Sequence, residues 1–109
     1  MKNETRIREN LSKALKVKLF KAEFSFVSDV IKTSVDFIYD SSGVRFLFEV
    51  DSNNAAKIIF GQYLLLNKVK QHSKNSFFVI IHCYKGYNAE RTSKHLNFAK
   101  EVYNCKLPF

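Results

Sequence analysis

The stretch VDFIYDSSGVRFLFEVD, residues 35 to 51, places Asp36, Glu49 and Asp51 among side chains that are typical of buried strands. β-Branched and aromatic residues alternate with other residues on both sides of DSSG, which indicates two strands joined by a turn. Asp and Ser side chains bond to their own backbone in such turns, and Gly tolerates positive φ. We therefore predict an antiparallel hairpin with strands over residues 34 to 40 and 44 to 51.

The alternation also assigns the acidic side chains to a face. Glu49 and Asp51 share one face of the second strand, and Asp36 joins them when Tyr39 pairs with Val44 across a four-residue turn. Carboxylates that converge in a partly buried place repel one another, and a divalent cation relieves the repulsion. Oxygen ligands suit Mg²⁺ or Mn²⁺, so the three acids are candidate metal ligands. The alternative is a solvent-exposed acidic face that pairs with surface cations.

The rest of the chain predicts alternating helices and strands around this hairpin. The strand over residues 44 to 51, the helix that follows and the next apolar strand imply a parallel crossover connection. We expect one α/β domain with a mixed sheet over residues 1 to 109, in the order αβββαβα. The further elements are an amphipathic helix over residues 4–19, a strand over 23–30, a buried helix over 52–71, a central strand covered on both faces over 76–84, and a second amphipathic helix over 88–104.

The charge balance points to an anionic partner. The formal net charge is +8, which favours nucleic acid or an anionic membrane surface, although a basic surface also serves solubility alone. Basic residues crowd the first helix and the start of the last one, where they are candidate phosphate contacts. The candidate nucleic-acid-binding residues are Arg6, Arg8, Lys13, Lys16, Lys57, Lys85, Arg91 and Lys94.

The cysteines and the N-terminus indicate the cellular compartment. Cys83 and Cys105 form no CxxC pair and have no His at zinc-finger spacing, so we expect free thiols, with a disulfide as the alternative. The first ten residues, MKNETRIREN, lack an apolar signal segment, and no stretch approaches the roughly 20 apolar residues of a membrane span. We therefore expect a cytoplasmic protein without a membrane segment.

The order of these motifs resembles the core of the PD-(D/E)xK nuclease superfamily, the restriction-endonuclease-like fold. Asp36 lies within one strand, Glu49-Val50-Asp51 ends the next, and a helix containing GQYLLL precedes an apolar strand. The resemblance covers about the whole chain and implies an αβββαβ core with an additional C-terminal helix. It implies Mg²⁺ or Mn²⁺ held by Asp36 and Glu49, a site role for Gln62, hydrolysis of DNA phosphodiester bonds, and a homodimer that cuts two strands.

One departure from the family pattern separates two hypotheses. Asp51 stands where the family carries the Lys that positions or activates the attacking water. In an active variant, Asp51 is a further metal ligand or a general base, and Lys57 either supplies a relocated ammonium group or is an ordinary surface lysine. The leading hypothesis is therefore a metal-dependent DNA endonuclease with Asp36, Glu49, Asp51 and Gln62 as its site. The rivals are a catalytically inactive nuclease-fold domain that binds nucleic acid or protein, and a small α/β protein whose acids only decorate its surface.

Overall fold

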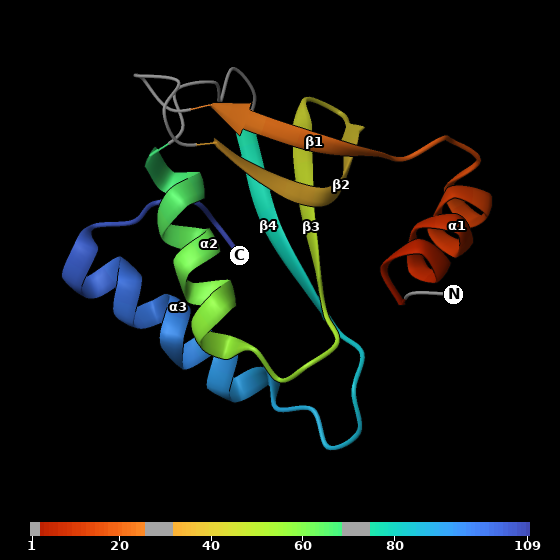
Figure 1. Cartoon of the computed structure of the whole chain (residues 1–109). Coiled ribbons are helices and arrows are strands. Elements are labelled where there is room, and N and C mark those ends of the chain that lie inside the picture. Colours follow the sequence, from red (N-terminus) through yellow and green to blue (C-terminus); the bar gives the residue numbers. More distant parts are fainter. Residues whose placement is uncertain (1–2, 26–31, 69–74) are drawn as a thin grey trace.

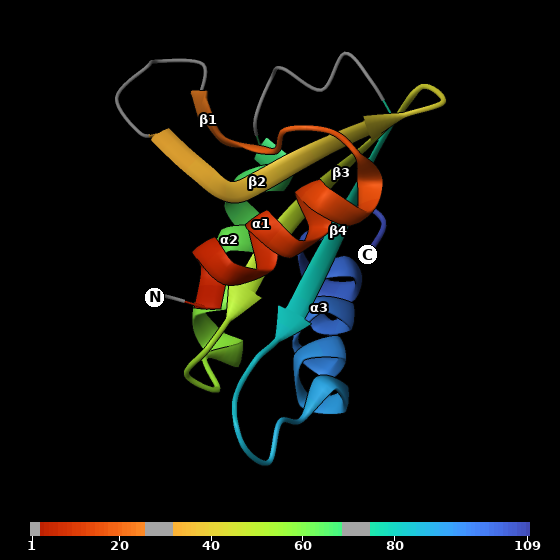
Figure 2. The same cartoon turned by 90° about the vertical axis from the view of Figure 1, so that its right-hand side faces the viewer.

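The computed structural model describes residues 3–25, 32–68 and 75–109, and these form a mixed α/β fold (Figure 1). Helices α2 and α3 cover one face of the sheet and α1 lies against the opposite face (Figures 1 and 2). The predicted α/β class and element order are confirmed, including the additional C-terminal helix. The elements are α1 (Asn3–Leu15), β1 (Phe20–Ser25), β2 (Lys32–Ser41), β3 (Val44–Asp51), α2 (Ala56–Lys68), β4 (Asn75–His82) and α3 (Ala89–Tyr103).

The described strands form one sheet in the order β1-β2-β3-β4. The first three strands make an antiparallel meander, and β3 pairs with β4 in parallel, as the crossover through α2 requires. Both features agree with the sequence prediction. The predicted first strand over 23–30 is shifted toward the N-terminus, because β1 is Phe20–Ser25 and residues 26–30 lie outside the described part of the chain.

The turn between β2 and β3 has two residues rather than four. Ser42 and Gly43 both have positive φ, 52° and 80°, as type I′ hairpins require. Ser41 therefore pairs with Val44, and the predicted pairing of Tyr39 with Val44 is wrong by two residues. Because side chains on a strand repeat every two residues, this shift leaves every side chain on its predicted face.

The main core lies between the sheet and the α2/α3 layer. Tyr63 of α2 is fully buried, stacks on Phe78 of β4 with ring centroids 5.8 Å apart, and donates its hydroxyl hydrogen to the carbonyl of Leu107. The C-terminal tail is thus bonded to the centre of the core. The other side chains with 0 or 1% exposure in this cluster are Val35, Leu47, Leu66, Leu96 and Ala99.

Strand β4 lies at an edge of the described sheet, so the prediction of a central strand is wrong. Its apolar run is only partly buried, because Phe78 is 1% exposed and faces the helices whereas Phe77 is 37% exposed, and the C-terminal tail lies beside the strand. The N–H of Phe78 donates to the carbonyl of Pro108 at 2.7 Å, and Leu107 is 8% exposed. Because the C-terminal tail bonds to its outer edge, β4 can have the apolar sequence that is typical of a central strand although it lies at the edge of the sheet.

Two of the helices differ from the prediction at one end, because α1 ends earlier and α2 begins later than predicted. α1 ends at Leu15 because Lys16 takes a left-handed φ of 57°, and Leu19, which we predicted to be helical, is buried just before β1. α2 begins at Ala56 rather than at residue 52 and is described as far as Lys68, while residues 69–71 lie outside the described chain. The limits of α3 match the prediction, because Asn88 and Asn104 cap its two ends.

Two further predictions concern the cysteines and the membrane. Cys83 and Cys105 are both free thiols in the structure, and Cys105 is buried. None of the helices within the described residues is long and apolar enough to cross a membrane.

Replacing Leu47 by Ala tests the core between β3 and α2. The side chain has no exposed surface, so we expect the free energy of unfolding to fall by about 2 to 5 kcal/mol, from lost burial and an unfilled cavity. Urea unfolding followed by circular dichroism measures this change. Val102→Ala is the matched control, because Val102 is 55% exposed and its loss is expected within about 0.5 kcal/mol. Equal losses for the two variants would contradict this description of the core.

Candidate functional site

Two acidic side chains meet where β2 and β3 run side by side. Phe37 pairs with Phe48, and the next position of this register sets Asp36 opposite Glu49. β2 also contains one extra residue relative to β1, because the pairing changes between positions 38 and 35 of β2. Such a bulge bends a strand and changes the direction of its side chains, and here it contains Asp36. The structure thus places these two carboxylates next to each other, on the shared face that the alternation predicted.

Backbone and amide groups hold the acidic pair. Oδ2 of Asp36 accepts a hydrogen bond of 2.7 Å from the N–H of Val50. Nε2 of Gln62 donates to Oε1 of Glu49 at 3.1 Å and also to the carbonyl of Ser34. Oε1 of Gln62 accepts from the hydroxyl of Thr33 at 2.5 Å, which fixes the orientation of the amide. Gln62 of α2 therefore links β2 and β3 at the acidic pair, in the place where the sequence analysis expected a site residue.

The surroundings of Glu49 favour its protonated form. Burial raises the pKa of Glu49 from 4.5 to about 8, and the neighbouring charge of Asp36 acts in the same direction. The hydrogen bond from Gln62 opposes this shift, whereas a hydrogen bond to Asp36 and the charge of Glu4 add to it. A buried carboxyl with a raised pKa beside a second carboxyl is a frequent feature of functional sites.

The acidic pair opens into a pocket of about 570 Å³ between the start of α1, the end of β3 and the start of α2. Glu4 lines this pocket, and sequence reasoning missed it. α1 reaches the pocket because Nδ2 of Asn3 donates to Oγ of Ser52 and to the carbonyl of Cys83, both at 3.2 Å. The acidic first turn of the helix was visible in the sequence, but its position over the sheet depends on these contacts between distant residues.

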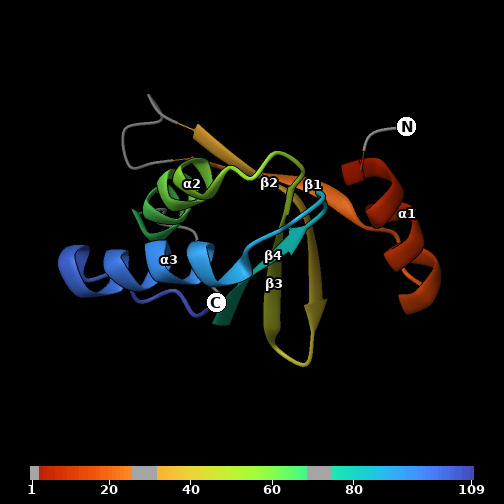
Figure 3. The same cartoon turned by 90° about the horizontal axis from the view of Figure 1, so that it is seen from below.

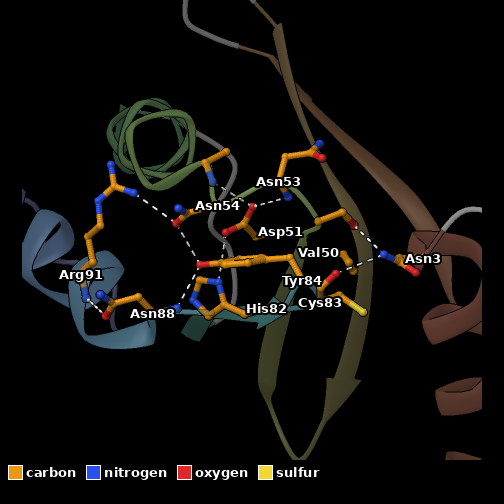
Figure 4. A network of polar contacts seen from close by, with 12 residues as sticks. Asn3, Val50, Asp51, Asn53, Asn54, His82, Cys83, Tyr84, Asn88 and Arg91 are labelled. Atoms are coloured by element: carbon orange, nitrogen blue, oxygen red, sulfur yellow. Dashed lines mark hydrogen bonds and ion pairs between the residues drawn. The ribbon is translucent and has the colours of Figure 1, made fainter. Parts of the chain in front are cut away.

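Asp51 lines the same pocket, but its oxygens are bonded elsewhere (Figure 4). Oδ1 accepts from the N–H groups of Asn53 and Ala55 at 3.2 and 3.1 Å, and Oδ2 lies 3.0 Å from Nδ1 of His82. Asp51 is only 3% exposed, so it closes the turn before α2 and pairs with a buried ring. Within the residues that the structure describes, no three His, Cys, Asp or Glu side chains form a group that could hold a metal ion. Asp36 and Glu49 are therefore brought together, whereas the geometry gives Asp51 a structural role.

Near Asp51, a second set of polar contacts lies at the end of the sheet where β3 and β4 finish (Figure 4). Oδ1 of Asn54 accepts from the hydroxyl of Tyr84 at 3.0 Å and from Nη1 of Arg91 at 3.1 Å. The N–H of Asn88 donates to the Tyr84 hydroxyl at 3.0 Å. The network joins the loop before α2 to the loop before α3, and it holds Arg91, a predicted phosphate contact, at the protein surface.

The predicted basic residues lie away from the floor of the acidic pocket. None of the described residues that line it is Lys or Arg. Nη2 of Arg6 donates to Oδ1 of Asn3 at 2.8 Å, which places this guanidinium near the pocket rim. Lys57 and Lys94 line a separate pocket between α2 and α3, so Lys57 is not positioned as a relocated ammonium group. The remaining predicted contacts lie on the surface: Lys13, Lys16 and Lys85 are exposed and Arg8 is half-exposed.

Comparison of the chain with protein-family models, with curated proteins and with solved structures found no match.

Replacing Glu49 by Gln tests the raised pKa. The unfolded chain loses this proton near pH 4.5 and the folded protein near pH 8, so folding takes up a proton within this window. The stability due to the protonated carboxyl is complete below about pH 4.5 and is lost as the pH rises through about 8. Gln cannot titrate, so the free energy of unfolding of Glu49→Gln should rise relative to that of the wild type between about pH 5 and pH 9.

Urea unfolding across this pH range measures the difference. Glu101→Gln, at an exposed position on α3, is the control and should follow the wild-type curve. Parallel curves for Glu49→Gln and the wild type would contradict the raised pKa.

Replacing Asp51 by Ala tests its structural role. The change removes the acceptor of two backbone N–H groups and the partner of His82, whose side chain is 8% exposed. We expect a loss of at least about 2 kcal/mol in the free energy of unfolding, measured by urea titration. Asp40→Ala removes the surface pair with Arg45 and should cost less than about 1 kcal/mol. A loss no larger than that of Asp40→Ala would show that the Asp51 contacts contribute little.

Proposed function

We propose that this protein is a small metal-dependent DNA endonuclease of the restriction-endonuclease-like fold. The observation that carries the proposal is the Asp36–Glu49 pair, held by Gln62 at the edge of an acidic pocket. The element order and the mixed sheet are consistent with the αβββαβ core of that fold, followed by α3.

The donor set at the pair fits Mg²⁺ or Mn²⁺. Mg²⁺ sites typically use one or two carboxylates and keep several waters, so two neighbouring carboxylates are sufficient. None of the described residues that line the pocket is a Lys or Arg that could neutralise the pair, and burial together with the charge of Asp36 raises the pKa of Glu49 and so disfavours its negative charge. Asp36 and Glu49 would hold the ion, while the bonded oxygens of Asp51 make it a poor third ligand.

In the proposed reaction the acidic pair would hold the metal ion, and neighbouring side chains would support it. Bound at Asp36 and Glu49, the divalent ion would activate water and stabilise the charge that develops on the attacked phosphate. Glu49 must lose its proton before it can coordinate a cation, and Gln62 restrains its carboxyl through the hydrogen bond to Oε1. Glu4 lines the same pocket, and its negative charge favours a cation there.

Duplex DNA is the proposed substrate because of the charge distribution. The formal net charge is +8, and Arg6 and Arg8 lie on the first helix, whose N-terminal turn lines the acidic pocket. Contacts of this type bind the phosphate backbone with little regard to sequence and weaken steeply with salt. The described residues of one chain form one such pocket, so cutting both strands of a duplex would require two copies acting together as a homodimer.

A catalytically inactive nuclease-like domain is the second candidate, and one observation favours it. The position of the family's Lys is occupied by Asp51, which is buried against His82 and therefore offers neither an ammonium group nor a free base. In this alternative the protein keeps the fold and binds DNA without cutting it.

Plasmid cleavage separates the two candidates. With Mg²⁺ or Mn²⁺ we expect the wild type to nick supercoiled plasmid, and Asp36→Asn and Glu49→Gln to lower the rate by at least about 100-fold, because each removes a metal ligand. Glu101→Gln should cut at the wild-type rate, because its position is exposed and does not line the pocket. Cutting that survives both substitutions would contradict the proposed site, and salt-sensitive binding of the plasmid without cutting would support the inactive domain.

A further inference from the structure

A second pocket lies on the other side of α2, between α2 and α3. Its volume is about 610 Å³, and we call it the Phe98 pocket after the exposed ring on its rim. Gln62 and Leu65 face the acidic pair, so α2 separates the two pockets. Figure 3 shows α2 and α3 side by side at the end of the molecule that is remote from α1. The lining residues are Lys57, Phe60, Lys94, His95 and Phe98.

The Phe98 pocket belongs to a patch of exposed apolar side chains. Phe98 is 52% exposed, and its α3 neighbours Val102 and Tyr103 are 55 and 52% exposed. The rings of Phe60, Phe98 and Tyr103 form one cluster, in which each pair of ring centroids is 6.2 or 6.3 Å apart. Contiguous apolar surface of this kind on a small protein is a mark of a binding surface.

The charges around the pocket are basic. Lys57 and Lys94 line it together with His95, and none of its described lining residues is acidic. Lys94 pairs with Glu90 at 3.2 Å, but both side chains are at least 75% exposed, so an incoming anion can readily replace this contact. The occupant should therefore carry negative charge beside an apolar or aromatic group.

We propose that the Phe98 pocket binds an unpaired nucleotide of single-stranded nucleic acid. The base would pack against Phe98 and Phe60, and the flanking phosphates would contact Lys57 and Lys94. Single-strand binding surfaces usually combine exposed aromatic rings with basic side chains. They accept every base because every base has a π-face that can stack on an aromatic ring. The inference is independent of the proposed nuclease activity, because it uses none of the acidic residues.

Two other occupants fit the pocket less well. A second copy of the chain also carries a net charge of +8, so basic rims would face each other. An acidic peptide would bury lysines, which are depleted in the cores of protein interfaces. A nucleic-acid strand leaves its phosphates and the lysines at the solvent-exposed rim, where their charges remain hydrated.

Binding of defined oligonucleotides to the full chain tests the proposal. The probe is fluorescein-labelled oligothymidylate of about 12 nucleotides, within the roughly 4 to 16 that small single-strand binding folds cover. The comparison probe has the same phosphates but abasic sugars. Anisotropy is measured without divalent metal, so that cleavage does not interfere and the result is independent of the nuclease proposal.

We expect the base-containing probe to bind more tightly than the abasic probe. Phe98→Ala should weaken oligothymidylate binding about tenfold and leave abasic binding unchanged, since stacking on one ring is lost. Phe98→Leu, which keeps apolar bulk, should lose a similar factor and guards against an effect of folding. Lys94→Gln should weaken the binding of both probes. It should also reduce the slope of log affinity against log salt concentration by about 0.7, the value for one phosphate contact on a single strand.

Phe20→Ala is the matched control. Phe20 is 59% exposed and lies under Lys18, 5.2 Å from its Nζ, but it lines no pocket described for this chain. Its loss should leave both affinities unchanged. Equal binding of the two probes by the wild type, or unchanged oligothymidylate binding by Phe98→Ala, would overturn the proposal. Competition by polyglutamate as strong as that by unlabelled oligothymidylate would also overturn it, in favour of an acidic peptide.

Discussion

The two-residue turn at Ser42 and Gly43 sets the register on which the candidate site depends. Positive φ at both positions lets β2 and β3 pair without a longer loop, and Ser41 then lies opposite Val44. The same register, followed along the hairpin, brings Asp36 and Glu49 together. A slip of one residue would turn one strand's side chains to the other face and separate the two carboxyl groups.

Once the two carboxyl groups are adjacent, the rest of the site limits their repulsion. Burial and the charge of Asp36 raise the pKa of Glu49 to about 8, which favours the protonated carboxyl in the folded protein near neutral pH. The N–H of Val50 and the amide of Gln62 stabilise the oxygens of the pair. In the function that we propose, a divalent cation would replace this proton. The Phe98 pocket, on the other side of α2, carries the opposite charge and an aromatic lining.

Much of the fold followed from the sequence, but particular parts of the site did not. The alternation in residues 35–51 predicted the hairpin and the shared face of Asp36 and Glu49, because strand periodicity is local. Asp51 has the same periodicity, and only the structure shows that its oxygens are bonded to His82 and to the turn before α2. Glu4 was missed, because nothing local indicates where the first helix lies relative to the sheet.

The sequence by itself determined which segments form helices and strands, which strand residues share a face, and where α3 begins and ends, because propensity, alternation and capping act between neighbours in the chain. The tertiary structure decided that β4 lies at an edge of the described sheet and that Glu4 reaches the acidic pair. It also decided that Asp51 caps a turn and that Phe60 and Phe98 form a pocket. These outcomes depend on contacts between residues far apart in the chain, and local patterns do not encode which distant side chains will satisfy a buried charge or cover an apolar ring.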